Sequence, residues 1–538
     1  LKLKRYIMNY KALLFLCITV GIFSCKPKEK TAAVNYDNFL NEYIDSTVSP
    51  GEDFFKFAMG KWLKNNPIPE SERSWGIWTL VNEENYSRIR KINEEAAANT
   101  KAKKGSNEQK IGDFWFTGMD TVTIEKQGIT PLKPELDKIA AISDPQGVIK
   151  MASYLHTMQV QPLFGNYIFQ DEKNSNKFRL HFYQGGIGLP DRDYYFDKDE
   201  RTVTIRNEYV KHISKMFQLT GIDAATADTY AQTIMKMETD FAGASRKLAD
   251  LRDPYANYNS MAVADVNKLC PAINWESFLA DAGIKNIDTI IVGQPEFFKQ
   301  LNTSLTKESV DNWKIYLQWN LINAYADRLS SDFDKEHFHF YGTILNGTKE
   351  QRARWKRVLD AEEDAMGFLL GQLYVEAYYP PEEKARYEKI VENTMAAYKV
   401  RIQQLDWMSP ETKEKALLKL STVIKKVGYP DKWRDYSALT ITRDSYVQNA
   451  INANKYLHAY EVEKLYKPVD KTEWEMTPQT WNAYYNPSNN EIVLPAAAFI
   501  VPGVPDKYVD DAIAYGYAAG STIGHEITHG FDDQGSQF

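Results

Sequence analysis

Apolar residues in this chain recur mainly at spacings of three and four, and this period restricts the fold to a largely helical one. The clearest case covers residues 382–405, where charged residues fill the positions between the apolar ones. Residues 408–427 follow the same pattern, and Ser409 and Pro410 form a favourable N-cap and first helical position. Two further segments with this pattern are 205–248 and 310–330. We therefore predict a fold that is mainly α.

Strand signals are few, and the best pair lies late in the sequence. Residues 480–485 and 491–494 are separated by a turn at 486–490. Pro495 closes the second run, and because proline cannot donate to a sheet ladder it favours an edge strand there. The prediction is a small β-sheet that includes both runs.

The length, aromatic content and charge of the chain indicate how many lobes it has and which partners are not expected. With 538 residues it is too long for one hydrophobic core, so two or more lobes are expected. Aromatic residues make up 13% of the chain, which indicates large packed cores and argues against disorder. The formal net charge is −7 with no basic block, so we expect no nucleic-acid partner.

Residues 1–24 have the pattern of an export signal peptide. Basic residues are followed by an apolar run, 12–23, that is too short to span a bilayer as a helix. Ser24-Cys25 resembles a bacterial lipobox, in which the cysteine receives a lipid, and residues 25–35 suit a flexible tether. We predict an exported cell-envelope lipoprotein, periplasmic or on the outer-membrane surface, with a lipid anchor on Cys25 as its membrane contact. The alternative is an ordinary secretory signal with a chance cysteine.

The stretch His525-Glu526-Ile527-Thr528-His529 carries the most chemical information. Two histidines four residues apart lie on one face of a helix, so both imidazoles can reach one tetrahedral cation. Glu526 is one step round the helix, where it can take a proton from a water that the cation activates. We predict one Zn²⁺ per chain, bound by His525 and His529, with Glu526 as the general base.

A helix over residues 506–530 is expected around this motif. Asp506 or Asp510 can cap its start, and Gly530 can end it. Glycine recurs every fourth residue within it, at Gly516, Gly520 and Gly524. Each glycine would cost roughly 1 kcal/mol in an exposed helix, so we expect a buried helix with another backbone packed closely against it. The alternative is a solvent-facing histidine pair on an ordinary helix.

Two histidines do not complete a zinc site. The extended motif HExxHxxGxxH is excluded, because Asp532 and Gly535 occupy the positions of its glycine and third histidine. The remaining alternative is a glutamate from a later helix, and the sequence ends at Phe538, nine residues after His529. Upstream glutamates could substitute, but no spacing selects one of them.

The sequence resembles the neprilysin family of metallopeptidases over nearly all of residues 36–538. The most diagnostic stretches are Asn482-Ala483-Tyr484-Tyr485 and residues 524–533. Further matching blocks begin at Ser49, Leu189, Trp355, Trp407 and Gly428.

The resemblance implies two helical lobes around a central cavity that admits peptides and excludes folded proteins. It implies a thermolysin-like (gluzincin) catalytic lobe formed by residues 36–85 and 410–538, and a helical covering lobe formed by 86–409. It also implies that Asn482 and Ala483 bind the backbone of oligopeptide substrates from an edge strand. Without the resemblance, a turn or cap residue is the preferred interpretation of Asn482.

The resemblance further implies a third zinc ligand from a glutamate in an ExxxD motif on a later helix. A later histidine and arginine would stabilise the transition state. All of these positions would lie beyond Phe538, so we expect residues 1–538 to be inactive alone and the complete product to be a zinc metalloendopeptidase. The competing hypothesis is a non-catalytic, membrane-anchored protein that binds peptides.

Three further features are better explained without a ligand. An acidic cluster, typical of the solvated face of a helix, consists of Asp360, Glu362, Glu363 and Asp364. His337 and His339 have strand spacing beside phenylalanines, and we expect partly buried packing residues. Cys270 has no evident base beside it in the sequence, so we expect a structural role.

Overall fold

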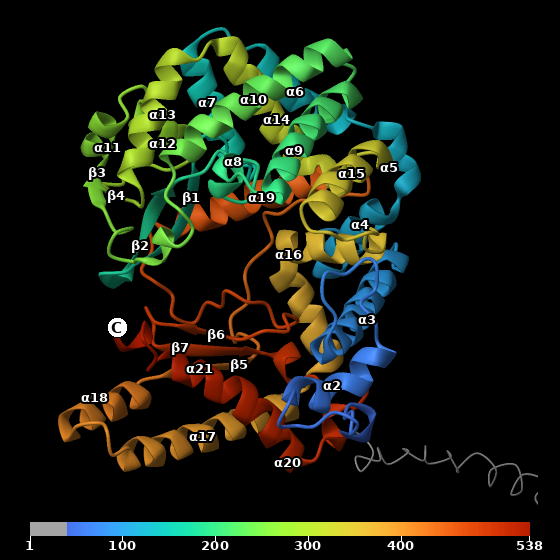
Figure 1. The fold of residues 1–538 in the computed structure, drawn as a ribbon, viewed down its shortest axis with the longest axis vertical. Helices are drawn as coiled ribbons and strands as arrows, with labels where there is room; N and C mark the ends of the chain where they lie inside the picture. Colours follow the sequence, from blue (N-terminus) through green and yellow to red (C-terminus); the bar gives the residue numbers. More distant parts are fainter. Residues whose placement is uncertain (1–39, 538) are drawn as a thin grey trace, which may run out of the picture. The chain divides into compact units, whose positions relative to one another are not determined.

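The structure is a computed structural model that describes residues 40–537 (Figure 1). The predicted signal peptide 1–24, Cys25 and the predicted tether 25–35 lie outside the described residues. The described chain forms two compact units, divided after Pro67. The first unit contains helix α2 (Phe54–Asn65), whose N-cap Asp53 accepts a hydrogen bond from a backbone amide. Between residues 40 and 537, no helix combines the length and the apolar character needed to cross a bilayer.

The second unit is mainly helical, as predicted. Its first nine α-helices in chain order are α3 (Ile77–Ala98), α4 (Asn107–Met119), α5 (Thr121–Gln127), α6 (Lys133–Ala140), α7 (Pro145–His156), α8 (Asp193–Phe196), α9 (Glu200–Leu219), α10 (Ala224–Ala244) and α11 (Val263–Leu269). The next eight are α12 (Trp275–Asp281), α13 (Pro295–Lys307), α14 (Val310–Tyr325), α15 (Ser331–His337), α16 (Arg354–Tyr378), α17 (Pro381–Gln404), α18 (Pro410–Ser421) and α19 (Tyr446–Lys464). Helices α20 (Asp511–Ala514) and α21 (Gly524–His529) end the series.

The predicted helices are present, with changed ends. The pattern over 382–405 corresponds to α17, and Ser409 caps α18 by accepting the Thr412 amide at 3.2 Å. Helix α18 stops at Ser421 rather than at 427, because residues 424–428 pair in a sheet. The pattern over 205–248 is two helices, α9 and α10, separated at Gly221, whose φ of 96° is left-handed.

The late strands form a three-stranded sheet in the order β5-β7-β6. Strands β6 (Tyr484–Asn486) and β7 (Glu491–Pro495) pair antiparallel, and β5 (Ile424–Gly428) joins β7 in parallel. The inference from Pro495 was wrong, because β7 is the central strand and Pro495 stands at its last position, opposite Gly428. Strand β6 lies at one edge of the sheet and β5 at the other. Helix α21 contacts strand β6 and helix α17 contacts strand β5, and Figure 1 shows both helices below this sheet.

A second sheet was not predicted from the sequence. It has four strands in the order β1-β2-β4-β3. Its strands are β1 (Gly165–Asp171), β2 (Asn174–Tyr183), β3 (Ser260–Ala262) and β4 (Thr289–Val292). Two of them are three or four residues long, which leaves too little alternation for a period of two to be recognised.

Two large hydrophobic cores fill the second unit. One gathers buried residues between 132 and 345 together with four residues of α19. The other gathers residues of α3, α4, α16 and α17 with the β5-β7-β6 sheet and residues 514–527. More than one core was expected for a chain of this length. The division into a catalytic lobe, 36–85 plus 410–538, and a covering lobe, 86–409, stays a prediction.

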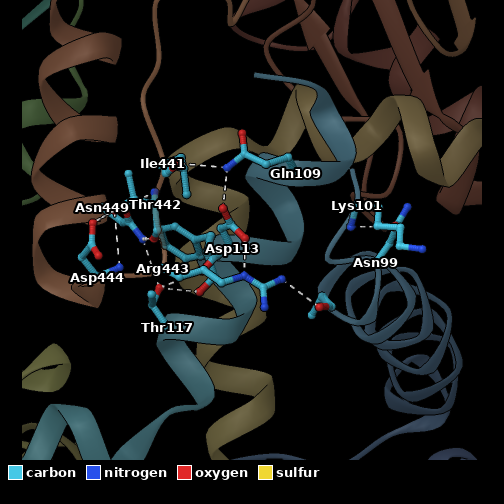
Figure 2. Close-up of polar contacts among 12 residues, drawn as sticks. Asn99, Lys101, Gln109, Asp113, Thr117, Ile441, Thr442, Arg443, Asp444 and Asn449 are labelled. Atoms are coloured by element: carbon cyan, nitrogen blue, oxygen red, sulfur yellow. Dashed lines mark hydrogen bonds and ion pairs between the residues drawn. The ribbon is translucent and has the colours of Figure 1, made fainter. Parts of the chain in front are cut away.

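Polar side chains fix α4 against the segment that leads into α19 (Figure 2). Arg443 donates to the Asp113 carboxylate at 2.6 Å and to the Ala97 carbonyl at 2.8 Å. Asn449, with 1% of its surface exposed, donates to the Thr117 hydroxyl at 3.1 Å. Because these buried groups satisfy one another, the contact between helix and loop is specific in position.

Candidate metal centre

The predicted metal-binding motif lies on α21, a helix of six residues at the end of a longer helical path. A π-helix, Tyr515–Ile523, leads into it, and α20 precedes the π-helix. Asp510 caps the start by accepting the Ala512 amide at 2.8 Å. The single helix expected over 506–530 is therefore three consecutive helical segments that begin at Asp511. Wide π-turns are frequent at functional sites, and this one ends at Ile523, two residues before His525.

The close backbone contact expected at the glycines is not found among the described residues. A Cβ atom built on Gly516 or on Gly520 would meet no described atom within 4 Å. A Cβ atom on Gly524 would meet only the Ala519 carbonyl at 2.9 Å and, at 3.9 Å, the Tyr398 hydroxyl. On the other side of the helical path, the side chains of Ala518, Ile523 and Ile527 are buried. The helix is thus buried on one side only, and the glycine side has no described neighbour at two of three positions.

The two histidines face each other as the spacing predicted. Their rings are perpendicular, with centroids 4.6 Å apart, and the Nε2 atom of His525 lies 3.0 Å from the Nε2 atom of His529. Two nitrogens bound to one tetrahedral zinc at about 2.0–2.1 Å would lie about 3.3 Å apart. The pair therefore fits a shared metal ion with little movement, and imidazole nitrogens are ligands that zinc prefers.

Asp532 orients His529 and was missed as a site residue. Its Oδ2 atom lies 2.8 Å from His529 Nδ1, and its Oδ1 atom accepts the amides of Gln534 at 3.0 Å and Gly535 at 2.7 Å. These contacts, led by the Gly535 amide, hold the pKa of Asp532 below its usual value. A carboxylate on Nδ1 directs the Nε2 lone pair of His529 toward His525 and raises its basicity as a ligand. The signal was an aspartate three residues after a metal-binding histidine.

Glu526 is the buried member of the motif, with 6% of its surface exposed. Burial raises the pKa of its carboxyl, and the neighbouring His525 and His529 act in the opposite direction. Glu526 and His525 line a cavity of about 310 Å³. The general base predicted from the sequence is thus placed beside the metal-binding pair, in a space that can take a small part of a ligand.

Asn482 and Ala483 line the same cavity as His525 and Glu526. They directly precede β6, an edge strand of the β5-β7-β6 sheet. The Asn482 side chain is exposed and accepts the Ala483 amide at 2.9 Å, which holds this segment in one conformation. The structure therefore brings the predicted substrate-binding residues to the predicted zinc-binding ones. The binding roles of these residues stay predictions, and Cys25, the predicted lipidation site, is not described.

The acidic cluster of α16 is only partly solvated, which corrects the expectation of a solvated face. Glu362 is 0% exposed, and burial raises the pKa of its carboxyl well above the usual value. Glu363 accepts hydrogen bonds from the side chains of Thr477 and Gln479, and burial raises its pKa as well. Of the other two, Asp364 is exposed but still desolvated enough that burial raises its pKa, and Asp360 pairs with Arg352 at 2.8 Å. The four acidic side chains leave α16 in different directions, so they range from buried to exposed. Their clustering in the sequence alone does not reveal this difference.

The remaining features fall largely as expected. Cys270 is fully buried, and burial raises the pKa of its thiol to about 12, so it is structural. His337 is partly buried, and burial lowers its pKa to about 4. His339 is exposed, which contradicts the expected packing role, and both histidines are helical rather than in a strand. Within residues 40–537, no three side chains among histidine, cysteine, aspartate and glutamate are placed to bind a metal together.

Comparison with known proteins decides the family. Two sequence profiles described as peptidase family M13 match this chain, one over residues 50–430 and the other over 482–538. The chain belongs to peptidase family M13. The resemblance to neprilysins is thereby confirmed, and the HExxH motif lies within the second matched region.

Relatives of this M13 chain are longer than the sequence given. Neprilysin-3 of Drosophila melanogaster is 30% identical over 523 residues, which cover 92% of this chain and 66% of the relative. Endothelin-converting enzyme 1 of Mus musculus is 29% identical over 526 residues, which cover 94% of this chain and 67% of the relative. The chain thus spans about two thirds of the length of these curated relatives.

Solved structures confirm the fold class of the M13 chain. The zinc metalloprotease Zmp1 of Mycobacterium tuberculosis, in complex with an inhibitor, matches with a TM-score of 0.86 and 36% identity. That match covers 93% of this chain and 75% of Zmp1. PepO from Lactobacillus rhamnosis matches in fold with a TM-score of 0.82 at 21% identity, covering 91% of this chain and 77% of PepO. The mainly α fold with small sheets is therefore that of M13 peptidases.

Proposed function

We propose that this chain is part of a zinc-dependent endopeptidase that hydrolyses oligopeptides. The observation that carries the proposal is the pairing of His525 and His529 through Nε2 atoms 3.0 Å apart, beside the buried carboxyl of Glu526. His525 and His529 would bind one Zn²⁺ per chain. The 36% identity to a protein described as a zinc metalloprotease supports the choice of metal.

Glu526 would act as the general base of this reaction. A bound zinc ion supplies Lewis acidity, which lowers the pKa of water toward neutrality. Glu526 would accept a proton from the attacking water and then deliver it to the nitrogen of the leaving amine, so that the C–N bond breaks without a free amide anion. Burial raises the pKa of Glu526, which makes the carboxylate a better acceptor for the proton of the attacking water.

Substrate binding would use the β6 edge of the β5-β7-β6 sheet. Strand β6 lies at this edge, and Asn482 and Ala483 precede it beside the cavity that contains His525 and Glu526. An extended peptide can add to such an edge through its main chain, which places a peptide carbonyl near the metal without selecting a particular side chain. Oligopeptides are therefore the proposed partners.

We also propose that residues 1–538 alone do not turn over peptides. Among residues 40–537, no third ligand accompanies His525 and His529, and a histidine pair binds zinc weakly. A glutamate from outside this sequence would complete the site, in keeping with relatives about half as long again as the part matched here. The second candidate function is non-catalytic peptide binding. We propose this function for residues 1–538 by themselves. For the complete protein, the intact set His525, Glu526 and His529 favours the enzyme.

Export and lipid anchoring complete the proposal. The support is the sequence of residues 1–24 and the lipobox-like Ser24-Cys25 pair. The anchored protein would work at the cell envelope, either in the periplasm or on the outer-membrane surface. Labelling of growing cells with a fatty-acid analogue tests this, because Cys25→Ser should lose the label. Equal labelling of both forms would contradict a lipid on Cys25.

Peptidase assays test the catalytic proposal. The complete protein, supplied with zinc, should cleave a quenched fluorescent peptide and lose this activity with a chelator, whereas residues 1–538 should be inactive. Glu526→Gln in the complete protein should retain zinc and lose roughly 10²–10⁴-fold in kcat, the usual contribution of a general base. A complete protein that carries no zinc, and that keeps full turnover after Glu526→Gln, would overturn the mechanism.

A further inference from the structure

The hydroxyl of Tyr398, on α17, contacts α21 at the two residues that precede the histidines. It donates to the Gly524 carbonyl at 2.6 Å, and it is hydrogen-bonded to the Thr528 hydroxyl. The Thr528 Oγ1 atom also lies 2.7 Å from the Gly524 carbonyl oxygen. Each hydroxyl has one proton, so Thr528 donates either to Gly524 or to Tyr398, and when it donates to Tyr398 the tyrosine hydroxyl is hydrogen-bonded to both residues. The three oxygens form a closed triangle between the two helices.

The triangle acts on the residues next to the ligands. Gly524 precedes His525 and Thr528 precedes His529, so each contact lies one helical step, about 100°, from a histidine. A tie at both residues restrains α21 against rotation about its own axis as well as against sliding. Tyr398 and His525 also line one cavity, of about 590 Å³. The tie is therefore next to the histidine pair.

On the side of α21 that faces α17, few other contacts among the described residues restrain the helix against rotation. The helix has six residues and follows a π-helix. Toward the start of the π-helix, Gly516 and Gly520 meet no described atom at the position of a Cβ. A second hydrogen bond from α17, between Asn393 and Tyr515, acts ten residues before His525.

We propose that Tyr398 is a positioning residue, which fixes the rotation of α21 and so keeps the two Nε2 atoms directed at one point. This inference rests on the proposed zinc site. Without the Tyr398 hydroxyl, α21 can turn by a few degrees, and His525 and His529 no longer bind the ion with their preferred geometry. Zinc affinity depends steeply on how ligands are held by their supporting contacts.

The test measures zinc binding, not only turnover. Complete protein of wild-type sequence, Tyr398→Phe and Tyr515→Phe would be stripped of metal and titrated with zinc against a chromophoric chelator. Tyr515→Phe is the matched control, because it also removes a hydrogen bond between α17 and the helical path, far from the histidines. We expect Tyr398→Phe to weaken zinc binding at least about tenfold, the lower end of losses typical for supporting contacts of metal ligands. Tyr515→Phe should bind as the wild type does.

Cobalt substitution and a second variant complete the test. The visible spectrum of the Co²⁺ form should change in Tyr398→Phe, whereas circular dichroism should show an unchanged fold. Thr528→Val should weaken zinc in the same direction, and the double variant should lose less than the sum of both, because both hydroxyls serve one carbonyl. Unchanged zinc affinity in Tyr398→Phe, or equal losses in Tyr398→Phe and Tyr515→Phe, would overturn the positioning role. A wild-type protein that binds no zinc would instead overturn the proposed function.

Discussion

Gln479 donates its side-chain amide to the carboxylate of Glu363 over 2.6 Å, and this bond joins the segment before the edge strand β6 to the middle of α16. The same amide donates to the Gly367 carbonyl at 2.8 Å. That carbonyl is next to Met366, where the backbone of α16 is kinked, with φ −155° and ψ 36°. The kink thus presents an acceptor to Gln479, whose side chain positions the chain only three residues before Asn482.

Replacement of Gln479 by leucine should destabilise the protein. Gln479 is 2% exposed, so Gln479→Leu removes one of the two side-chain donors to the Glu363 carboxylate and the side-chain donor to the Gly367 carbonyl. A loss of about 2–3 kcal/mol in the free energy of unfolding is expected for buried acceptors that lose a donor. Urea unfolding followed by circular dichroism measures it. The exposed Gln448→Ala on α19 is the control and should stay within about 0.5 kcal/mol of the wild type. Equal stability of Gln479→Leu and the control would contradict the role of this bond.

Local sequence predicted the motif and a minority of the individual helices, among them α9, α10, α14, α17 and α18. Histidines four residues apart must share a helical face, so the meeting of His525 and His529 follows from spacing alone. Helix α17 and the cap of α18 at Ser409 are likewise local features. The end of α18 was misjudged because residues 424–428 take part in a sheet, and strand pairing depends on a partner 67 residues later in the chain.

Burial and long-range contacts could not be predicted in the same way. Glu362 and Glu363 carry charges that favour a solvated helix face, yet contacts with distant segments bury them. Pro495 suggested an edge strand, but the order β5-β7-β6 depends on where β5 docks. Asp532 was missed because its role depends on the turn after α21, whose amides aim its carboxylate at His529. The errors at α16 and at Pro495 arose where tertiary contacts decide the outcome, whereas Asp532 was missed although its contacts lie within three residues along the chain.

The core that gathers residues between 132 and 345 contains a buried carboxyl, that of Glu238, which is hydrogen-bonded to several segments. Glu238 of α10 is 1% exposed and accepts hydrogen bonds from Tyr195 at 2.6 Å, Tyr209 at 3.0 Å and the Gly188 amide at 3.1 Å. Burial raises the pKa of Glu238 to about 7, although these three donors favour the charged form. Since Tyr195 also accepts the Leu189 amide at 3.1 Å, the carboxyl holds the turn before α8 in place.

The pH dependence of stability should therefore contain a contribution from Glu238. Its pKa is about 7 in the folded protein against 4.5 for an ordinary glutamate, so the folded state binds the proton more tightly. The resulting stabilisation is complete below about pH 4.5 and is lost as the pH rises through about 7, at about 1.4 kcal/mol per unit of pKa difference. Glu238→Gln removes this titration. Urea unfolding between pH 4.5 and 7.5 should show wild-type stability falling relative to the variant, and a constant difference would contradict the shift.

Lys426 and Glu491 form a buried ion pair between β5 and β7, with Nζ and Oε2 2.7 Å apart and side chains 6% and 2% exposed. Lys426→Met would leave the Glu491 carboxylate buried without its cation, next to Glu475, whose pKa is already raised by burial and by Glu491. A loss of about 3–5 kcal/mol in the free energy of unfolding is expected. The double variant Lys426→Met with Glu491→Leu should recover most of it, because no buried charge is left unpaired. Denaturant unfolding of all three proteins measures this, and a double variant as unstable as Lys426→Met would contradict it.

Asp532 offers the most direct test of how His529 is held. Asp532→Ala removes the acceptor on His529 Nδ1, so the ring loses its fixed orientation, and the affinity of the complete protein for zinc should fall about 10–100-fold. Asp533→Ala is the matched control, because Asp533 is the next residue, has the same charge and is exposed. Its carbonyl accepts hydrogen bonds from the side chains of Ser536 and Gln537, and the substitution keeps this carbonyl. Both variants lose one negative charge, so a long-range electrostatic effect would weaken zinc binding equally in both. Chelator competition at fixed ionic strength separates the two explanations. A loss confined to Asp532→Ala assigns the effect to the 2.8 Å contact with the imidazole, whereas equal losses would mean that this contact does not orient His529 for the metal.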